Sequence, residues 1–184
     1  MDSNKLQKLC SIPILKPGFR GILSFKTLLS KQSLNTSINR IGDFIIINWK
    51  NSHWICFLRS SGKEVFVFDS LYGVVGKNIL KKIISDKFEI KRISLQYGRG
   101  RLQNIDAITC GEHLVYFLLY QKLFFKDFAV FDRKYVKTII NFCNKKNITP
   151  DYFIWTEVYC KMRLARPPNL EEVLYWEDNK KNNK

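Results

Sequence analysis

Histidine is scarce in this chain of 184 residues, and cysteine does not form a metal-binding pattern. There are only two histidines, and the five cysteines are odd in number and widely spaced, without a CxxC pair: Cys10, Cys56, Cys110, Cys143 and Cys160. Structural zinc sites need clustered Cys and His ligands, and disulfide scaffolds use an even set of cysteines. The sequence therefore argues against both, and we expect the protein to work in a reducing compartment.

Long apolar runs are also missing. No run approaches the ~20 residues that cross a bilayer, and the N-terminal stretch MDSNKLQKLCSIPILKPGF has no uninterrupted apolar core of the signal-peptide type. We therefore expect no membrane partner and no secretion signal.

Acidic residues are few relative to basic ones. Lys and Arg total 31 against 16 Asp and Glu, which gives a formal net charge of +15. Such a charge attracts polyanions, so sequence-independent DNA binding is one expectation. The charge is scattered, however, and AT-biased coding rich in Lys, Ile and Asn would produce it without any partner. Both interpretations stay open.

The hydrophobic share of 46% and the aromatic share of 14% predict an ordinary folded core. We expect one domain over residues 1–176 and a disordered basic tail over 177–184. Periodicity predicts an α+β chain in which strands precede helices. The predicted elements are a helix capped by Ser3 and ending near Cys10, strands at 42–49, 53–59 and 64–70, a helix at 78–88, a strand at 89–95, a loop at 96–109, and helices at 110–125, 132–144 and 150–162.

The sequence SSG between two of these strands predicts a hairpin register. A three-residue loop with Gly62 in the left-handed conformation would place Arg59 opposite Lys63. Counting outward, His53 then faces Asp69, with Cβ atoms ~5 Å apart. At that distance a carboxylate can orient an imidazole and support its charge.

Cys110 begins a helix that is apolar on nearly every side and should be buried. Free N–H groups and the helix dipole at such a position stabilise a thiolate, and Gly111 lets other backbone come close, as an oxyanion site requires. The alternative is a buried structural thiol, which is a common role for cysteine.

A nucleophilic thiol needs a base, and the two histidines are the candidates. His113 lies on the same helix but near its positive end, where an imidazolium is disfavoured. His53 is paired with Asp69 by the hairpin. Considered alone, His53 would be a polar residue at a strand end and Asp69 a turn residue. The combination of His53, Asp69 and Cys110 predicts a thiol-protease triad.

Four segments carry a family resemblance: SHWICF (52–57), VFVFDSLYG (65–73), LQNIDAITCGEHLVYFL (102–118) and, less closely, ILKPGFRGILSF (14–25). Their order and spacing resemble the adenovirus-type maturation proteases (adenains), which are related in fold to the SUMO-deconjugating cysteine proteases. The resemblance covers roughly the first two thirds of the chain. It implies a papain-like α+β fold, with a central mixed sheet packed by helices and the nucleophile at the start of a buried central helix.

The resemblance also assigns roles to residues. It makes Cys110 the nucleophile, His53 the general base and Asp69 the group that orients the base. Gln103, seven residues before the cysteine, would donate its side-chain amide to the oxyanion beside the backbone N–H of Cys110. Trp54 would lie beside the imidazole.

Two positions depart from the adenovirus pattern. The adenovirus enzyme has Glu where this chain has Asp69, although its SUMO-protease relatives use Asp. Adenain also binds an activating peptide through a cysteine upstream of the glutamine, and residues 57–109 contain no cysteine. A noncovalent viral peptide or DNA is the activator that the resemblance leaves open, and the chemistry requires no cofactor or metal.

The function expected from this resemblance is cleavage of capsid or precursor proteins during maturation of a virus, virophage or polinton-like element. The enzyme would then be found in the virion and in the cytoplasm or nucleus of the host. One alternative is a peptidase that removes a ubiquitin-like modifier. An alternative of another class is a basic nucleic-acid-binding module with an inert thiol.

Overall fold

A computed structural model describes residues 1–30, 38–62, 64–71, 76, 78–79, 82–83, 96–97, 101–124 and 128–161. Three of the predicted segments lie wholly or mostly outside these residues. The strand at 89–95 and the tail at 177–184 lie outside the described residues, as does most of the helix at 78–88, of which 78–79 and 82–83 are helical.

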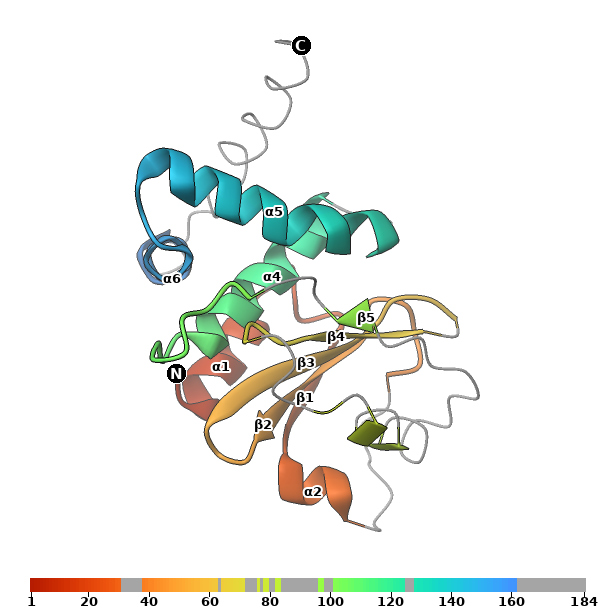
Figure 1. Ribbon diagram of the computed structural model, residues 1–184. Helices are drawn as coiled ribbons and strands as arrows, with labels where there is room; N and C mark the ends of the chain where they lie inside the picture. Colours follow the sequence, from red (N-terminus) through yellow and green to blue (C-terminus); the bar gives the residue numbers. More distant parts are fainter. Residues whose placement is uncertain are drawn as a thin grey trace.

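The described strands form one mixed sheet in sequential order (Figure 1). They are β1 (Phe19–Ser24), β2 (Phe44–Trp49), β3 (His53–Arg59), β4 (Val65–Phe68) and β5 (Gln96–Tyr97). The pairs β2–β3 and β3–β4 are antiparallel, whereas β1–β2 and β4–β5 are parallel. The three predicted strands from 42 to 70 are confirmed. The loop predicted at 96–109 is wrong at its start, where β5 extends the sheet edge.

Strand residues alternate between two apolar layers, as the two-residue period of a strand requires. Even-numbered residues pack against the large helical layer: Phe44, Ile46, Cys56, Leu58, Phe66 and Phe68. Odd-numbered residues form a smaller cluster with Leu28, Ile38 and Ile83: Ile45, Ile47, Ile55, Phe57, Val65 and Val67. Because apolar clusters cover both faces of the sheet, the strand sequences are nearly continuous apolar runs.

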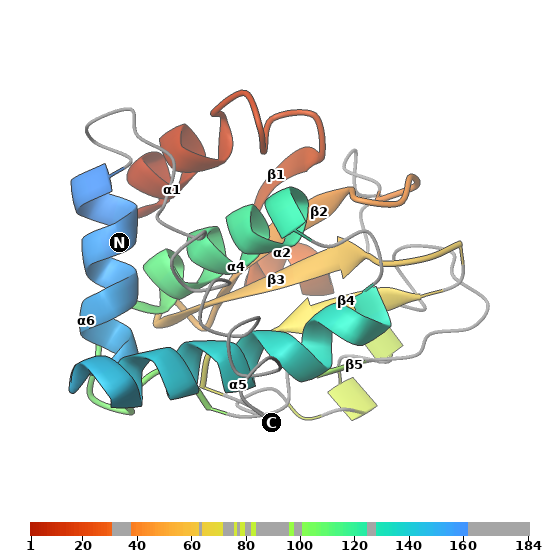
Figure 2. The same ribbon diagram turned by 90° about the horizontal axis from the view of Figure 1, so that it is seen from above.

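Helices α1 (Ser3–Cys10), α4 (Cys110–Phe124), α5 (Phe128–Lys146) and α6 (Pro150–Trp155) contribute to the large layer, and a π-helix (Thr156–Lys161) continues α6. Figure 2 shows α4 running across the sheet between α1 and α5, with α6 at one end. The short α2 (Phe25–Leu29) lies on the other side. None of the helices in the described ranges is both long and apolar enough to cross a membrane.

The buried central helix predicted from residue 110 is confirmed as α4. Its residues 114–120 are all buried, so it has no solvent face over two turns. The cap predicted for the first helix is wrong by one residue. Asp2, not Ser3, caps α1 by accepting a hydrogen bond from the backbone N–H of Lys5 at 2.9 Å.

The hairpin register differs from the prediction by two residues. Arg59 pairs with Val65 rather than Lys63, and Gly62 does not adopt a left-handed φ. A hydrogen bond from Ser60 N–H to the Glu64 carbonyl at 3.0 Å closes the longer loop instead. A shift of two residues, unlike a shift of one, preserves which side chains share a face.

Candidate active site

His53 and Asp69 meet at one end of the sheet. His53 is the first residue of β3, Asp69 directly follows β4, and both are buried. His53 Nε2 lies 2.8 Å from Asp69 Oδ1, and the same oxygen accepts a hydrogen bond from Leu71 N–H at 3.0 Å. In the observed register the two residues are diagonal neighbours and not directly opposite each other, so the predicted contact is present although the predicted pairing is not.

Cys110 reaches the imidazole from the helical layer. It is the first residue of α4, with 7% of its surface exposed. Its side chain interacts with that of His53. Since Asp69 engages Nε2, Nδ1 is the ring nitrogen left for the thiol. The three residues therefore form a chain from thiol to imidazole to carboxylate.

The surroundings of His53 favour its charged form. Burial by itself lowers the pKa of His53, but the hydrogen bonds and charges of Asp69 and Cys110 outweigh it and raise the pKa to about 9, from an ordinary value of 6.5. An imidazolium at neutral pH can hold a neighbouring thiolate as an ion pair. This arrangement can generate a nucleophile without a metal.

Gln103 lies on the segment that leads into Cys110, and its side-chain amide has a fixed orientation. Its Oε1 accepts a hydrogen bond from Ser70 Oγ at 2.6 Å, and its Nε2 donates to the Ala107 carbonyl. A flipped amide would place two oxygens against each other at Ala107. An amide nitrogen carries two protons, so one N–H remains after this bond.

Ser70 holds this segment to the sheet, and the sequence did not single it out. Its carbonyl accepts hydrogen bonds from the backbone N–H groups of Leu102 and Gln103, both at 3.1 Å. Together with the side-chain bond, Ser70 therefore fixes Gln103 at two atoms, its backbone N and its Oε1, and fixes Leu102 at a third. The only sequence signal was its position directly after Asp69, which indicated a turn.

His113 is placed away from the role of base. It is fully buried, and its Nε2 lies 3.0 Å from Oδ1 of Asp151, on α6. The sequence prediction that His53 is the better candidate agrees with this geometry. Asp151 itself was missed, because only the folded chain brings α6 beside α4.

A cavity of about 470 Å³ opens over the thiol and the imidazole. Cys110, His53 and Gln103 line it, with residues 105–108 on one wall and residues 1–3 on another. Ile105 and Ile108 are exposed at this wall. The described lining includes no Lys or Arg, in contrast to the strongly basic chain.

Trp54 directly follows His53 in β3 and lines the same cavity as His53 and Cys110. The indole N–H of Trp54 donates to the Met1 carbonyl at 3.0 Å. A Cβ added at Gly111 would lie 2.9 Å from the Met1 Cβ and 3.4 Å from Trp54 Cδ1. The missing side chain of Gly111 thus makes room for Met1 at the start of α4.

The other described thiols differ from Cys110. Burial raises the pKa of Cys10 and of Cys143 to about 12, and burial also raises the pKa of Cys56 well above its usual value. No group of three or more His, Cys, Asp or Glu side chains suited to a metal ion occurs within the part of the chain that the structure describes.

Neither the known family models nor the curated proteins gave a match to this chain. The functional assignment therefore rests on the geometry of the site and on the sequence resemblance.

Proposed function

We propose that the protein is a cysteine endopeptidase with Cys110, His53 and Asp69 as its catalytic triad. The observation that carries this proposal is the 2.8 Å contact between His53 Nε2 and Asp69 Oδ1 beside a thiol at a helix N-terminus, where His53 and Cys110 line a cavity. A base held in one tautomer by a carboxylate, and in turn contacting a nucleophile, is the arrangement that acyl transfer needs.

The residues have distinct roles in the reaction. The Cys110 thiolate attacks the substrate carbonyl, and the resulting oxyanion is stabilised by the remaining Gln103 Nε2–H and the backbone N–H of Cys110. His53 then gives its proton to the leaving amine, which releases the first product and leaves a thioester. A water molecule, deprotonated by His53, hydrolyses the thioester and restores the thiol.

The proposal extends to fold family and setting through the resemblance. The mixed sheet, the buried α4 and the order of His53, Asp69, Gln103 and Cys110 along the chain support a papain-like, adenain-like protease. The substrates would be capsid or precursor proteins cleaved during virion maturation. DNA or a noncovalent viral peptide would act as activator, without any cofactor in the chemistry.

A second candidate uses the same chemistry on a different substrate. The carboxylate beside His53 comes from Asp69, the residue type that SUMO-deconjugating proteases use, whereas the adenovirus enzyme uses Glu. Removal of a ubiquitin-like modifier is therefore the alternative activity.

Both activities can be tested with the same set of proteins. The wild type is incubated with a mixture of quenched fluorescent peptides with glycine at the scissile bond, and separately with vinyl-ester probes of ubiquitin-like modifiers. Cleavage that disappears in Cys110→Ala and in His53→Ala supports the endopeptidase, and probe adducts on Cys110 support the alternative. A folded wild type that cleaves no peptide, reacts with no probe and alkylates Cys110 no faster than Cys10 would contradict both, leaving the non-catalytic nucleic-acid-binding module.

A further inference from the structure

We propose that Asp151 and His113 are positioning residues that hold the oxyanion donors in place from behind the active site. This inference rests on the proposed function. The segment at issue is residues 101–109, here called the oxyanion loop, which connects Gln103 to Cys110. It contains a turn closed by a hydrogen bond from Ala107 N–H to the Asn104 carbonyl at 3.1 Å and is otherwise irregular, so contacts from outside the loop help to fix its position.

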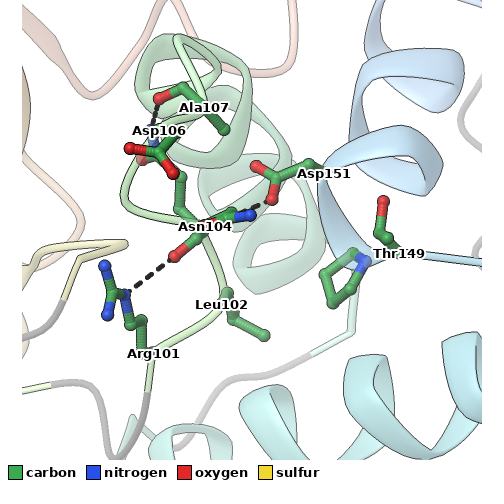
Figure 3. Close-up of a pocket in the computed structure, with 9 residues that line it drawn as sticks. Arg101, Leu102, Asn104, Asp106, Ala107, Thr149 and Asp151 are labelled. Atoms are coloured by element: carbon green, nitrogen blue, oxygen red, sulfur yellow. Dashed lines mark hydrogen bonds between the residues drawn. The ribbon is translucent and has the colours of Figure 1, made fainter.

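Asp151 accepts three hydrogen bonds, two from the oxyanion loop and one from α4. Its Oδ2 accepts from Asn104 N–H at 2.8 Å, and its Oδ1 accepts from Thr109 Oγ1 and from His113 Nε2, the latter at 3.0 Å. Figure 3 shows Asp151 at the start of α6 pointing toward Asn104. Both residues line a cavity of about 580 Å³. One carboxylate therefore joins the loop, α4 and α6.

The positions of Asn104 and Thr109 in the sequence connect the hydrogen bonds of Asp151 to the proposed catalysis. Asn104 directly follows Gln103, and Thr109 directly precedes Cys110. The carboxylate thus holds both ends of the short stretch between the two proposed oxyanion donors. Ser70, which follows Asp69 after β4, fixes Gln103, and Asp151 on α6 fixes the next residue, Asn104.

The charge of the Asp151 carboxylate favours strong hydrogen bonds to its three partners. Partial burial raises the pKa of Asp151, but hydrogen bonds from His113, Thr109 and Asn104 outweigh it and hold the pKa below its usual range. The ionised carboxylate only accepts hydrogen bonds, so the Nε2 of His113 carries the proton. Charge-assisted hydrogen bonds of this kind are stronger than neutral ones. The His113 ring is fully buried, so the carboxylate is its means of orientation.

The variant Asp151→Asn tests the role of the carboxylate, because it keeps the size of the side chain and replaces one acceptor oxygen by a donor. Thr109→Val removes a single bond and serves as a milder second variant. Thr149→Ala is the control: it removes the N-cap of α6, where Thr149 Oγ1 accepts from Tyr152 N–H at 3.2 Å, but leaves all three Asp151 partners intact.

Two rates are measured for each variant: turnover of the peptide that the wild type cleaves fastest, and alkylation of Cys110 by iodoacetamide across pH. Alkylation needs the thiolate but no oxyanion site. We expect kcat to fall about tenfold to hundredfold in Asp151→Asn, and less in Thr109→Val, since loss of a whole oxyanion donor costs 10²–10³. The alkylation rate and its pH profile should stay within about twofold of the wild type, and Thr149→Ala should keep kcat.

Three results would overturn the inference while leaving the proposed function intact. These are unchanged turnover in Asp151→Asn, a parallel fall of turnover and alkylation in both Asp151→Asn and Thr109→Val, and an equal loss of kcat in Thr149→Ala. A wild type that alkylates Cys110 rapidly and cleaves peptides is required for each comparison. Failure of that wild-type reaction counts against the proposed function itself.

Discussion

Cys110 differs from the other described thiols in its surroundings more than in its exposure. All four are buried, but only Cys110 begins a helix and contacts His53. Cys10 and Cys143 have pKa values raised to about 12 by burial, so they stay protonated at neutral pH. Alkylation rates can therefore distinguish the proposed nucleophile from the other described thiols.

We predict that iodoacetamide at pH 7.5 modifies Cys110 at least tenfold faster than Cys10, Cys56 or Cys143 in the folded protein, because alkylation proceeds through the thiolate. Peptide mapping by mass spectrometry gives the rate for each site. The variant His53→Ala is the control, since it should remove most of the difference. Equal rates at all four sites in the native wild type would contradict the proposed role of Cys110 as the nucleophile.

The Asp69 carboxylate should set the pH range of activity. His53 has a pKa of about 9 in the folded protein, and Asp69 is the leading contribution that raises it. In Asp69→Asn this pKa should fall toward 6.5, so the alkaline limb of the pH profile of kcat/KM should move to lower pH. We also expect at least a tenfold loss at the optimum, because the tautomer is no longer held. An unchanged alkaline limb would show that Asp69 does not act on His53.

The same shift predicts a pH dependence of stability. A raised folded-state pKa stabilises the native state fully below the unfolded value near 6.5, and this contribution is lost as pH rises through about 9. The difference in melting temperature between wild type and Asp69→Asn should therefore be largest near pH 6 and shrink above pH 9. Thermal melts of both proteins from pH 5.5 to 10 test it.

At the scale of elements, the sequence predicted best where one pattern decided the structure. The apolar runs in β2, β3 and α4 have unambiguous length and periodicity, and their bounds agree within two residues. The strand β1 was not predicted because Gly21 interrupts it with a φ of 125° and every residue is half-buried. Its parallel partner is distant in sequence, so no local signal marks it.

In the candidate site, too, local patterns were predictable and contacts between distant residues were not. The contact between His53 and Asp69 depends only on which strand residues share a face, and a register shift of two residues leaves this unchanged. Ser70 and Asp151 were missed because their roles arise from hydrogen bonds to distant residues, as in the 47-residue separation between Asn104 and Asp151. Such partners cannot be read from spacing or composition.

Two glycines that look alike in sequence should respond differently to alanine. A Cβ at Gly18 would collide with the Gly42 carbonyl oxygen at the β1–β2 end, where Gly18 O also accepts from Phe44 N–H at 2.7 Å. Overpacking against backbone costs ~1–3 kcal/mol. At Gly62 nothing lies within 4 Å of an added Cβ. We expect Gly18→Ala to lower the free energy of unfolding by about that amount and Gly62→Ala to change it by under ~0.5 kcal/mol, as measured by urea denaturation. Equal effects would mean that the two backbones do not approach each other as described.

At the scale of the whole molecule, the net charge of +15 comes from Lys and Arg residues spread along the chain. The described lining of the candidate cavity includes no Lys or Arg, so a polyanion would contact other surfaces. Arg101 is the described basic residue closest in sequence to Gln103, and its exposed side chain donates from Nε to the Gln103 carbonyl at 3.0 Å. Arg101 ends the basic stretch KRISLQYGRGR (91–101). A second basic stretch, KNILKK (77–82), precedes it in the sequence.

We predict that the protein binds duplex DNA without sequence preference, with an affinity that falls roughly tenfold or more between 50 and 200 mM salt if several phosphates are engaged. Fluorescence anisotropy with two unrelated duplexes measures this.

Two double variants test whether DNA binding is coupled to peptide cleavage. The first combines Arg99→Gln and Arg101→Gln, the second combines Lys180→Gln and Lys181→Gln, and each removes two positive charges. If DNA acts through the oxyanion loop, both should bind more weakly, but only the arginine pair should lose the DNA-dependent part of peptide cleavage. Binding without any change in cleavage by the wild type would make DNA a track along which the protein diffuses. No binding at 50 mM salt would leave the charge as a property of composition, because phosphate contacts are strongest at low salt.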